Sequence, residues 1–102
     1  MEAIAEVSPQ EALKTKRDEI LRLAARHGAR NVRLFGSAAR GEAGPKSDLD
    51  FLVEMEPVHS PWFPAGLVAD LEDLLGCKVD VVTPHALHWY IRDQVLKEAI
   101  AL

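Results

Sequence analysis

Two short apolar runs, one ending in a glycine-serine turn and the other opening on paired carboxylates, constrain this chain more than any other feature. The run Val32–Phe35 ends in Gly36 and Ser37, and a second run begins where Asp48 and Asp50 stand on either side of a leucine. In a strand, residues i and i+2 point to the same face. If the second run is a strand, it presents two carboxylates side by side.

Adjacent carboxylates repel each other unless a cation lies between them. Divalent metals such as Mg²⁺ take oxygen ligands and keep phosphate oxygens and water in their remaining positions. Asp48 and Asp50 therefore form a candidate metal site. Ser47 precedes the pair. Its hydroxyl could orient Asp48 or could instead bond to the local backbone, and the sequence leaves both readings open.

The glycine-serine turn supplies donors for an anion. Gly36 lets the backbone approach a ligand closely, and a turn that leads into a helix offers free N–H groups to a phosphate. The hydroxyl of Ser37 and the guanidinium of Arg40 add further donors, and arginine is suited to bidentate phosphate contact. Phosphate donors beside metal ligands predict a site for a metal-bound nucleotide.

The segment Gly36–Val53 closely resembles the signature of the DNA polymerase β-like nucleotidyltransferase superfamily, which is Gly-Ser followed by Asp-x-Asp. In this chain the two parts of the signature are Phe-Gly-Ser-Ala-Ala-Arg-Gly and Ser-Asp-Leu-Asp. This looks like the minimal branch, the minimal nucleotidyltransferases or MntA-type antitoxins that are paired with HEPN-domain toxins. The likeness runs over most of the chain, including Ile91–Leu102, but only the Gly-Ser and Asp-x-Asp part is specific.

A third carboxylate, Asp80, lies between Val79 and Val81 in another apolar run. The resemblance implies that it joins the Asp-x-Asp pair on a neighbouring strand. The alternative is that Asp80 faces solvent on an edge strand or pairs with an arginine. The implied site comprises catalytic and metal-binding Asp48, Asp50 and Asp80, and nucleotide-binding Gly36, Ser37, Arg40 and Ser47.

The resemblance implies an enzyme of the adenylyltransferase kind, with ATP as donor and two Mg²⁺ ions. It would transfer AMP to a hydroxyl, expected on a tyrosine, of a separately encoded HEPN-type toxin and so act as its antitoxin. The alternative is an antitoxin that neutralises its partner by binding alone. Transfer to a small molecule, as in antibiotic-modifying enzymes, is disfavoured because no acceptor domain is visible. Oligomers of the chain, with itself or with a partner, are left open.

Composition sets the remaining limits. The chain has 102 residues, 48% of them hydrophobic, and a net charge of −4, which predicts one small domain over residues 1–102 that does not grip nucleic acid directly. The single cysteine, Cys77, excludes an internal disulfide, fits a reducing compartment and is read as a small buried residue. No apolar run reaches the ~20 residues of a membrane span. We therefore expect a cytoplasmic protein.

Alternation of helices and strands predicts an α/β fold with a small mixed sheet flanked by helices, as in the polymerase β-like proteins. Strands are expected at Val32–Phe35, Leu49–Val53 and Val79–Val82. A helix is expected from Ser8 as N-cap, through a capping box with Glu11, to a stop at Gly28, and another at Ala65–Leu75. One helical turn is expected at Ala38–Arg40 and a loop at Gly41–Lys46.

The last helix is expected to begin after Thr83 as N-cap and to bury a stripe of Leu87, Ile91, Val95 and Leu96. Aromatic residues are enriched at interface hot spots, so those outside the core are candidates for a partner surface. Such residues occur in the proline-rich stretch Pro57–Pro64 and on the last helix: Trp62, Phe63, Trp89 and Tyr90. Any of them could instead be core.

Overall fold

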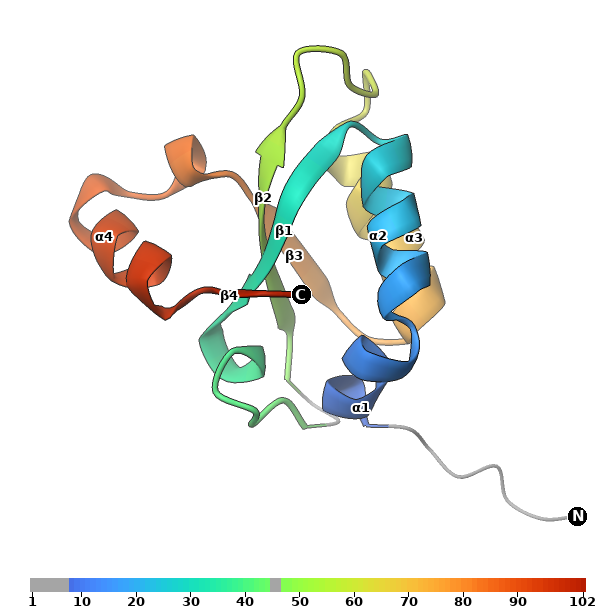
Figure 1. Cartoon of the computed structure of the whole chain (residues 1–102), viewed down its shortest axis with the longest axis vertical. Coiled ribbons are helices and arrows are strands. Elements are labelled where there is room, and N and C mark those ends of the chain that lie inside the picture. Colours follow the sequence, from blue (N-terminus) through green and yellow to red (C-terminus); the bar gives the residue numbers. More distant parts are fainter. Residues whose placement is uncertain (1–7, 45–46) are drawn as a thin grey trace, which may run out of the picture.

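A four-stranded sheet forms the centre of the protein (Figure 1). We describe residues 8–44 and 47–102 of a computed structural model. The strands are β1 (Ala29–Phe35), β2 (Leu49–Met55), β3 (Val79–Val82) and β4 (Ile100–Ala101). Their order is β3-β2-β1-β4, with β2 parallel to β3 and antiparallel to β1, and β4 antiparallel to β1. The predicted mixed sheet is thus confirmed.

Three helices cover one face of the sheet, and the fourth stands off on the other side (Figure 1). They are α1 (Pro9–Thr15), α2 (Arg17–Arg26), α3 (Ala65–Leu75) and α4 (Trp89–Glu98), with 3-10 turns η1 (Gly36–Ala38) and η2 (Pro84–Ala86). None of the helices in the described ranges is long and apolar enough to cross a membrane.

The hydrophobic core lies between the sheet and the three helices. Phe51 and Leu49 of β2 are fully buried and pack with Ile20 of α2 and Leu67 and Leu71 of α3. Because side chains alternate along a strand, the residues between the core positions of β2 point to the other face. That second face carries Asp50 and Glu54, with the fully buried Leu52 between them.

The predicted N-cap is confirmed, because the Ser8 hydroxyl accepts a hydrogen bond from the Glu11 N–H at 3.1 Å, while the return bond of the Glu11 side chain stays a prediction. The single helix expected from Ser8 to Gly28 is wrong, since it is interrupted at Lys16, whose φ and ψ are −111° and 18°. Lys16 Nζ donates to the Leu74 carbonyl at 3.0 Å. This contact with α3 is tertiary, and the helical periodicity does not reveal it.

The helix Ala65–Leu75 and the strand Val79–Val82 are confirmed as predicted. Gly76 ends α3 with a φ of +70°, the left-handed conformation that favours glycine after a helix. The expected loop Gly41–Lys46 lies partly outside the described residues, which omit Pro45 and Lys46.

The last helix differs from its prediction in both its start and its burial. Thr83 precedes only the short turn η2, and the backbone is extended again at Leu87 before α4 begins. No residue of α4 is fully buried, and Ile91 and Leu96 are 40% and 36% exposed. The apolar stripe exists, but the helix stands away from the core that was expected to cover it.

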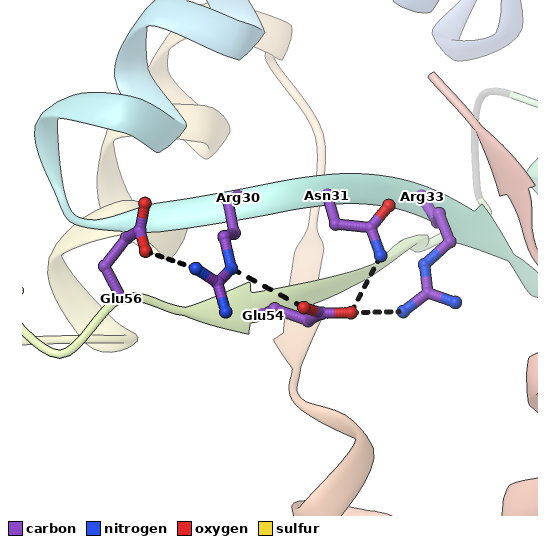
Figure 2. A network of polar contacts seen from close by, with 5 residues as sticks. All are labelled: Arg30, Asn31, Arg33, Glu54 and Glu56. Atoms are coloured by element: carbon purple, nitrogen blue, oxygen red, sulfur yellow. Dashed lines mark hydrogen bonds and ion pairs between the residues drawn. The ribbon is translucent and has the colours of Figure 1, made fainter.

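A polar network extends β1 and β2 beyond their predicted ends (Figure 2). β1 begins three residues before the expected Val32, with a bulge between Arg30 and Arg33 where Asn31 has a φ of +50°. Asn31 Nδ2 donates to Glu54 Oε2 at 2.8 Å, and Arg30 Nη1 donates to Glu56 Oε1 at 2.7 Å. Cross-strand polar pairs of this kind stabilise a sheet where it leaves the core.

Glu54→Gln is expected to lower stability at neutral pH by no more than about 1 kcal/mol, because the side chain is partly exposed. The Asn31 hydrogen bond, and then the charges of Arg30 and Arg33, hold the pKa of Glu54 below its ordinary value. This stability is present above the ordinary glutamate pKa and is lost as pH falls through the lower folded value. Urea unfolding should therefore show a lower free energy of unfolding for Glu54→Gln than for the parent at pH 7, and this difference should disappear at pH 3. Glu19→Gln, exposed on α2, is the control and should show no such trend.

Candidate active site

The register of the central strand brings the predicted site residues to one end of the sheet. Asp50 of β2 is paired with Phe35 on β1, directly before the glycine turn, and with Asp80 on β3. Asp48 directly precedes β2 and is exposed. The two sheet pairings therefore bring the Asp-x-Asp pair, the glycine turn and the third carboxylate together from segments far apart in the sequence.

The charges of these carboxylates affect one another. Burial raises the pKa of Asp50, and the negative charges of Asp80 and then Asp48 raise it further. Asp80 itself is exposed and lies on the edge strand β3. It thus faces solvent, as the alternative reading supposed, and also stands beside Asp50, as the resemblance implied. The site concentrates negative charge that a cation would relieve.

Gly36 is fitted against the central carboxylate. Its φ is +69°, and a Cβ built on it would lie 2.5 Å from Oδ2 of Asp50. We expected glycine here for close approach to a ligand, and the structure adds a contact with Asp50 that the sequence did not reveal. The helical turn expected at Ala38–Arg40 is instead η1, which begins at Gly36 itself.

The turn after Gly36 is held by its own backbone. The Ser37 carbonyl accepts hydrogen bonds from the N–H groups of Arg40 and Glu42 at 3.1 and 2.9 Å. The Arg40 side chain is exposed, and its Nε donates to Glu42 Oε1 at 3.1 Å. Phosphate binding by Ser37 and Arg40 stays a prediction, and it would require Arg40 to exchange this carboxylate for a phosphate.

Ser47 makes the local bond that the sequence left open. Its hydroxyl accepts from the Gly44 N–H at 3.1 Å, and its own N–H donates to the Gly44 carbonyl at 3.0 Å. The structure therefore gives Ser47 a role in shaping the loop that leads to Asp48.

Gln10 of α1 is a supporting residue that the sequence analysis missed. Its Nε2 donates to the Ala38 carbonyl and its Oε1 accepts from the Ala43 N–H, both at 3.1 Å. The side chain thus joins the end of η1 to the following loop. Nothing in the local pattern indicates this contact, because Gln10 is 28 and 33 residues away from its two partners.

A metal cluster of three ligands is not preformed. In the part of the chain that the structure describes, no group of three or more His, Cys, Asp or Glu side chains is arranged to hold a metal ion. The donor chemistry nevertheless fits, because Asp48, Asp50 and Asp80 offer the oxygen ligands that Mg²⁺ prefers. Metal binding by these residues stays a prediction.

Cys77 lies close to the site without the properties of a reactive thiol. It is half-buried, and burial, followed by the charges of Asp48 and Glu72, raises its pKa. The thiolate, which is the nucleophilic form, is therefore disfavoured. The expected non-reactive reading of Cys77 suits this environment.

The candidate partner aromatics separate into two groups. Trp62, Trp89 and Tyr90 are 76%, 76% and 66% exposed, whereas Phe63 packs against the core. Trp89 and Tyr90 begin α4, which lies on the side of the sheet away from α1, α2 and α3 (Figure 1). A partner surface at α4 stays a prediction.

Comparisons with known proteins point to one family. Residues 13–102 match the family described as nucleotidyltransferase domain. The chain is 37% identical over 82 residues to a candidate protein adenylyltransferase of Methanocaldococcus jannaschii, covering 80% of this chain and 88% of that protein. It is 41% identical over 75 residues to the protein adenylyltransferase MntA of Thermococcus cleftensis, covering 74% and 76%.

Solved structures share the fold. The structure of a candidate minimal nucleotidyltransferase superimposes with a TM-score of 0.81 at 49% identity, covering 91% of this chain and 95% of that chain. A mutant of the toxin–antitoxin pair MntA–HpeT superimposes with a TM-score of 0.67 at 23% identity, covering 84% of this chain and 70% of that chain. At 23% identity, the similarity to the second structure shows a shared fold alone.

Asp50→Asn is expected to raise the thermal midpoint at pH 7 by a few degrees in the presence of a chelator. The raised pKa of Asp50 means that the folded state loses stability as pH rises through that value, and asparagine removes the charge responsible. The difference from the parent protein should vanish near pH 3, where the carboxyl is protonated in both states.

Scanning calorimetry at the two pH values measures this difference. Asp93→Asn on α4, where the aspartate is exposed in contrast to Asp50, serves as the control and should change the thermal midpoint little. An Asp50→Asn protein that is less stable than the parent at pH 7 would contradict the mutual repulsion described above.

Proposed function

Because this chain belongs to the nucleotidyltransferase domain family, as a minimal nucleotidyltransferase of the MntA type, we propose that it transfers AMP from ATP to a protein hydroxyl. The acceptor is a tyrosine of a separately encoded HEPN-type toxin, which the modification silences in the cytoplasm. The observation that carries this proposal is the contact of the Gly36 turn with Asp50, beside Asp80 in register.

The phosphate chain of ATP would lie along the turn after β1. Gly36 permits close backbone approach there, and Ser37 and Arg40 would donate to the β- and γ-phosphates. The acceptor oxygen would attack the α-phosphorus from the side opposite the leaving group. The bond from the α-phosphorus to the bridging oxygen breaks and pyrophosphate leaves.

The three carboxylates would serve metal binding and proton transfer. Asp48, Asp50 and Asp80 would hold Mg²⁺, which neutralises the phosphate charge and makes the acceptor hydroxyl more acidic. Asp80 is exposed on the edge strand and would take the acceptor's proton. Tyrosine suits this chemistry because its phenol, with a pKa of about 10, is more acidic than an aliphatic hydroxyl.

A second protein would supply the acceptor hydroxyl at the end of the sheet where Asp48 and Asp80 are exposed. Two hollows of about 390 Å³ each lie elsewhere among the described residues, one between α2 and α3 and one beside Glu54, Thr83 and His85. None of the residues lining them is a site carboxylate. The exposed aromatic residues of α4 suit contact with such a partner, and they also suit the alternative in which the antitoxin neutralises its partner by binding alone.

The glycine turn is tested by a matched pair of substitutions. Gly36→Ala and Gly41→Ala each add a methyl group at a positive φ, +69° and +74°, but only the first meets Asp50, since none of the described residues lies within 4 Å of the second. Gly41→Ala should cost about 1 kcal/mol of stability or slightly more, and Gly36→Ala should cost more than Gly41→Ala, because its methyl group also displaces the Asp50 side chain. AMP transfer should fall by about 100-fold or more for Gly36→Ala alone. Equal transfer by the two variants would contradict nucleotide binding at the Gly36 turn.

The transfer itself is tested by intact mass measurement. The chain is incubated with ATP, magnesium and the separately encoded HEPN-type protein that we propose as its partner, and this protein should gain the mass of one or more AMP groups on tyrosine. The Asp48→Asn/Asp50→Asn double variant should bind the partner and leave its mass unchanged. If that variant silences the toxin as fully as the parent does, the binding-only alternative is correct.

A further inference from the structure

Arg33 is a cation on the same face of the sheet as Asp50 and Glu54. Most N–H donors of its guanidinium are not used in hydrogen bonds with the described residues. Its side chain is only 18% exposed, and its Nη2 lies 3.7 Å from Glu54 Oε2, beyond hydrogen-bond length. Its Nε is buried and has no hydrogen-bond partner within residues 8–44 and 47–102. A buried donor without a partner costs free energy, so the placement of Arg33 requires an explanation.

Glu54 explains the placement of Arg33 only in part, because Asn31 and Arg30 lie closer to its carboxylate than Arg33 does (Figure 2). Asn31 Nδ2 donates to Glu54 Oε2 at 2.8 Å, and Arg30 Nε lies 3.5 Å from Glu54 Oε1. Both contacts are shorter than that of Arg33. The network at this end of β2 would therefore keep its strongest contacts without Arg33.

The strand register places Arg33 between two carboxylates. Arg33 is paired with Leu52, so its diagonal neighbours along β2 are Asp50 and Glu54. Diagonal neighbours on one face are about 7–8 Å apart and within reach of long side chains. The guanidinium can therefore point toward Glu54, as observed, or toward a phosphate bound next to Asp50.

We propose that Arg33 is a nucleotide-contacting residue, whose guanidinium turns from Glu54 to the α-phosphate of ATP bound over Asp50. This inference rests on the function proposed above. The β- and γ-phosphates would occupy the Gly36 turn at the end of β1, so the phosphate nearest Arg33, two residues before Phe35 on that strand, is the α-phosphate. Its oxygens gain negative charge during transfer, which a bidentate guanidinium stabilises.

Three variants separate this role from a structural one. Arg33→Gln should lower AMP transfer at saturating ATP by about 100-fold and weaken binding of the non-hydrolysable analogue AMP-PNP at least about tenfold. Arg33→Lys keeps the charge and the aliphatic stem but loses the bidentate contact, and should recover only part of the loss. Arg30→Gln, the matched control on the same strand and also a partner of Glu54, should bind AMP-PNP as the parent does.

A double-mutant cycle with Glu54→Gln decides whether Arg33 acts through Glu54. If Arg33 contacts the nucleotide, Glu54→Gln should leave AMP-PNP binding at least as tight as in the parent, and Arg33→Gln should cause the same loss in either background. If Arg33 only anchors Glu54, then Glu54→Gln reproduces the loss and the second substitution adds nothing.

The results that would overturn the role of Arg33 differ from those that would overturn the proposed function. Parent-like AMP-PNP binding by Arg33→Gln overturns the assignment, as does a loss reproduced by Glu54→Gln. Where Arg33→Gln does not fold, parent-like AMP-PNP binding and transfer by Arg33→Lys overturn the proposed bidentate contact with the α-phosphate, because a single point charge would then suffice. A parent chain that neither binds AMP-PNP with magnesium nor transfers AMP overturns the proposed function together with this inference.

Discussion

The pairing of β2 with a strand on either side is the constraint on which the rest of the molecule depends. One face of β2 supplies Leu49 and Phe51, which are fully buried under the helices. The same pairing fixes the other face, where Asp50 lies between Phe35 of β1 and Asp80 of β3. A slip of one residue would exchange the two faces, so burial of the apolar set also specifies where the carboxylates stand.

That arrangement lowers the stability of the fold at the end of the sheet where the candidate site lies. Asp50 is partly buried among like charges, and Gly36 holds a left-handed conformation against it. Neither feature favours folding, and both suit the binding of a metal-bound phosphate that we propose. Groups held at a cost in stability are typical of functional sites. The fully buried core under the helices supplies the rigid scaffold that such a site needs.

The sequence predicted those parts of the fold whose signals are local. Ala65–Leu75 was found because an apolar stripe ends at a glycine, and Gly36 and Asp50 because their spacing carries a known signature. The break at Lys16 was missed because it accompanies a bond to Leu74, 58 residues away. Periodicity identified an apolar face on the last helix, but it could not reveal that this face lies away from the core.

The two hydrogen bonds of Gln10 connect the first helix to the turn and loop of the candidate site. α1 has seven residues, too few to persist alone in water, so it is ordered only while it packs on the domain. Whenever α1 detaches, the hydrogen bonds of Gln10 to Ala38 and Ala43 are lost at the same moment. Local unfolding at the N-terminal end would thus disable the site while the central sheet stays intact.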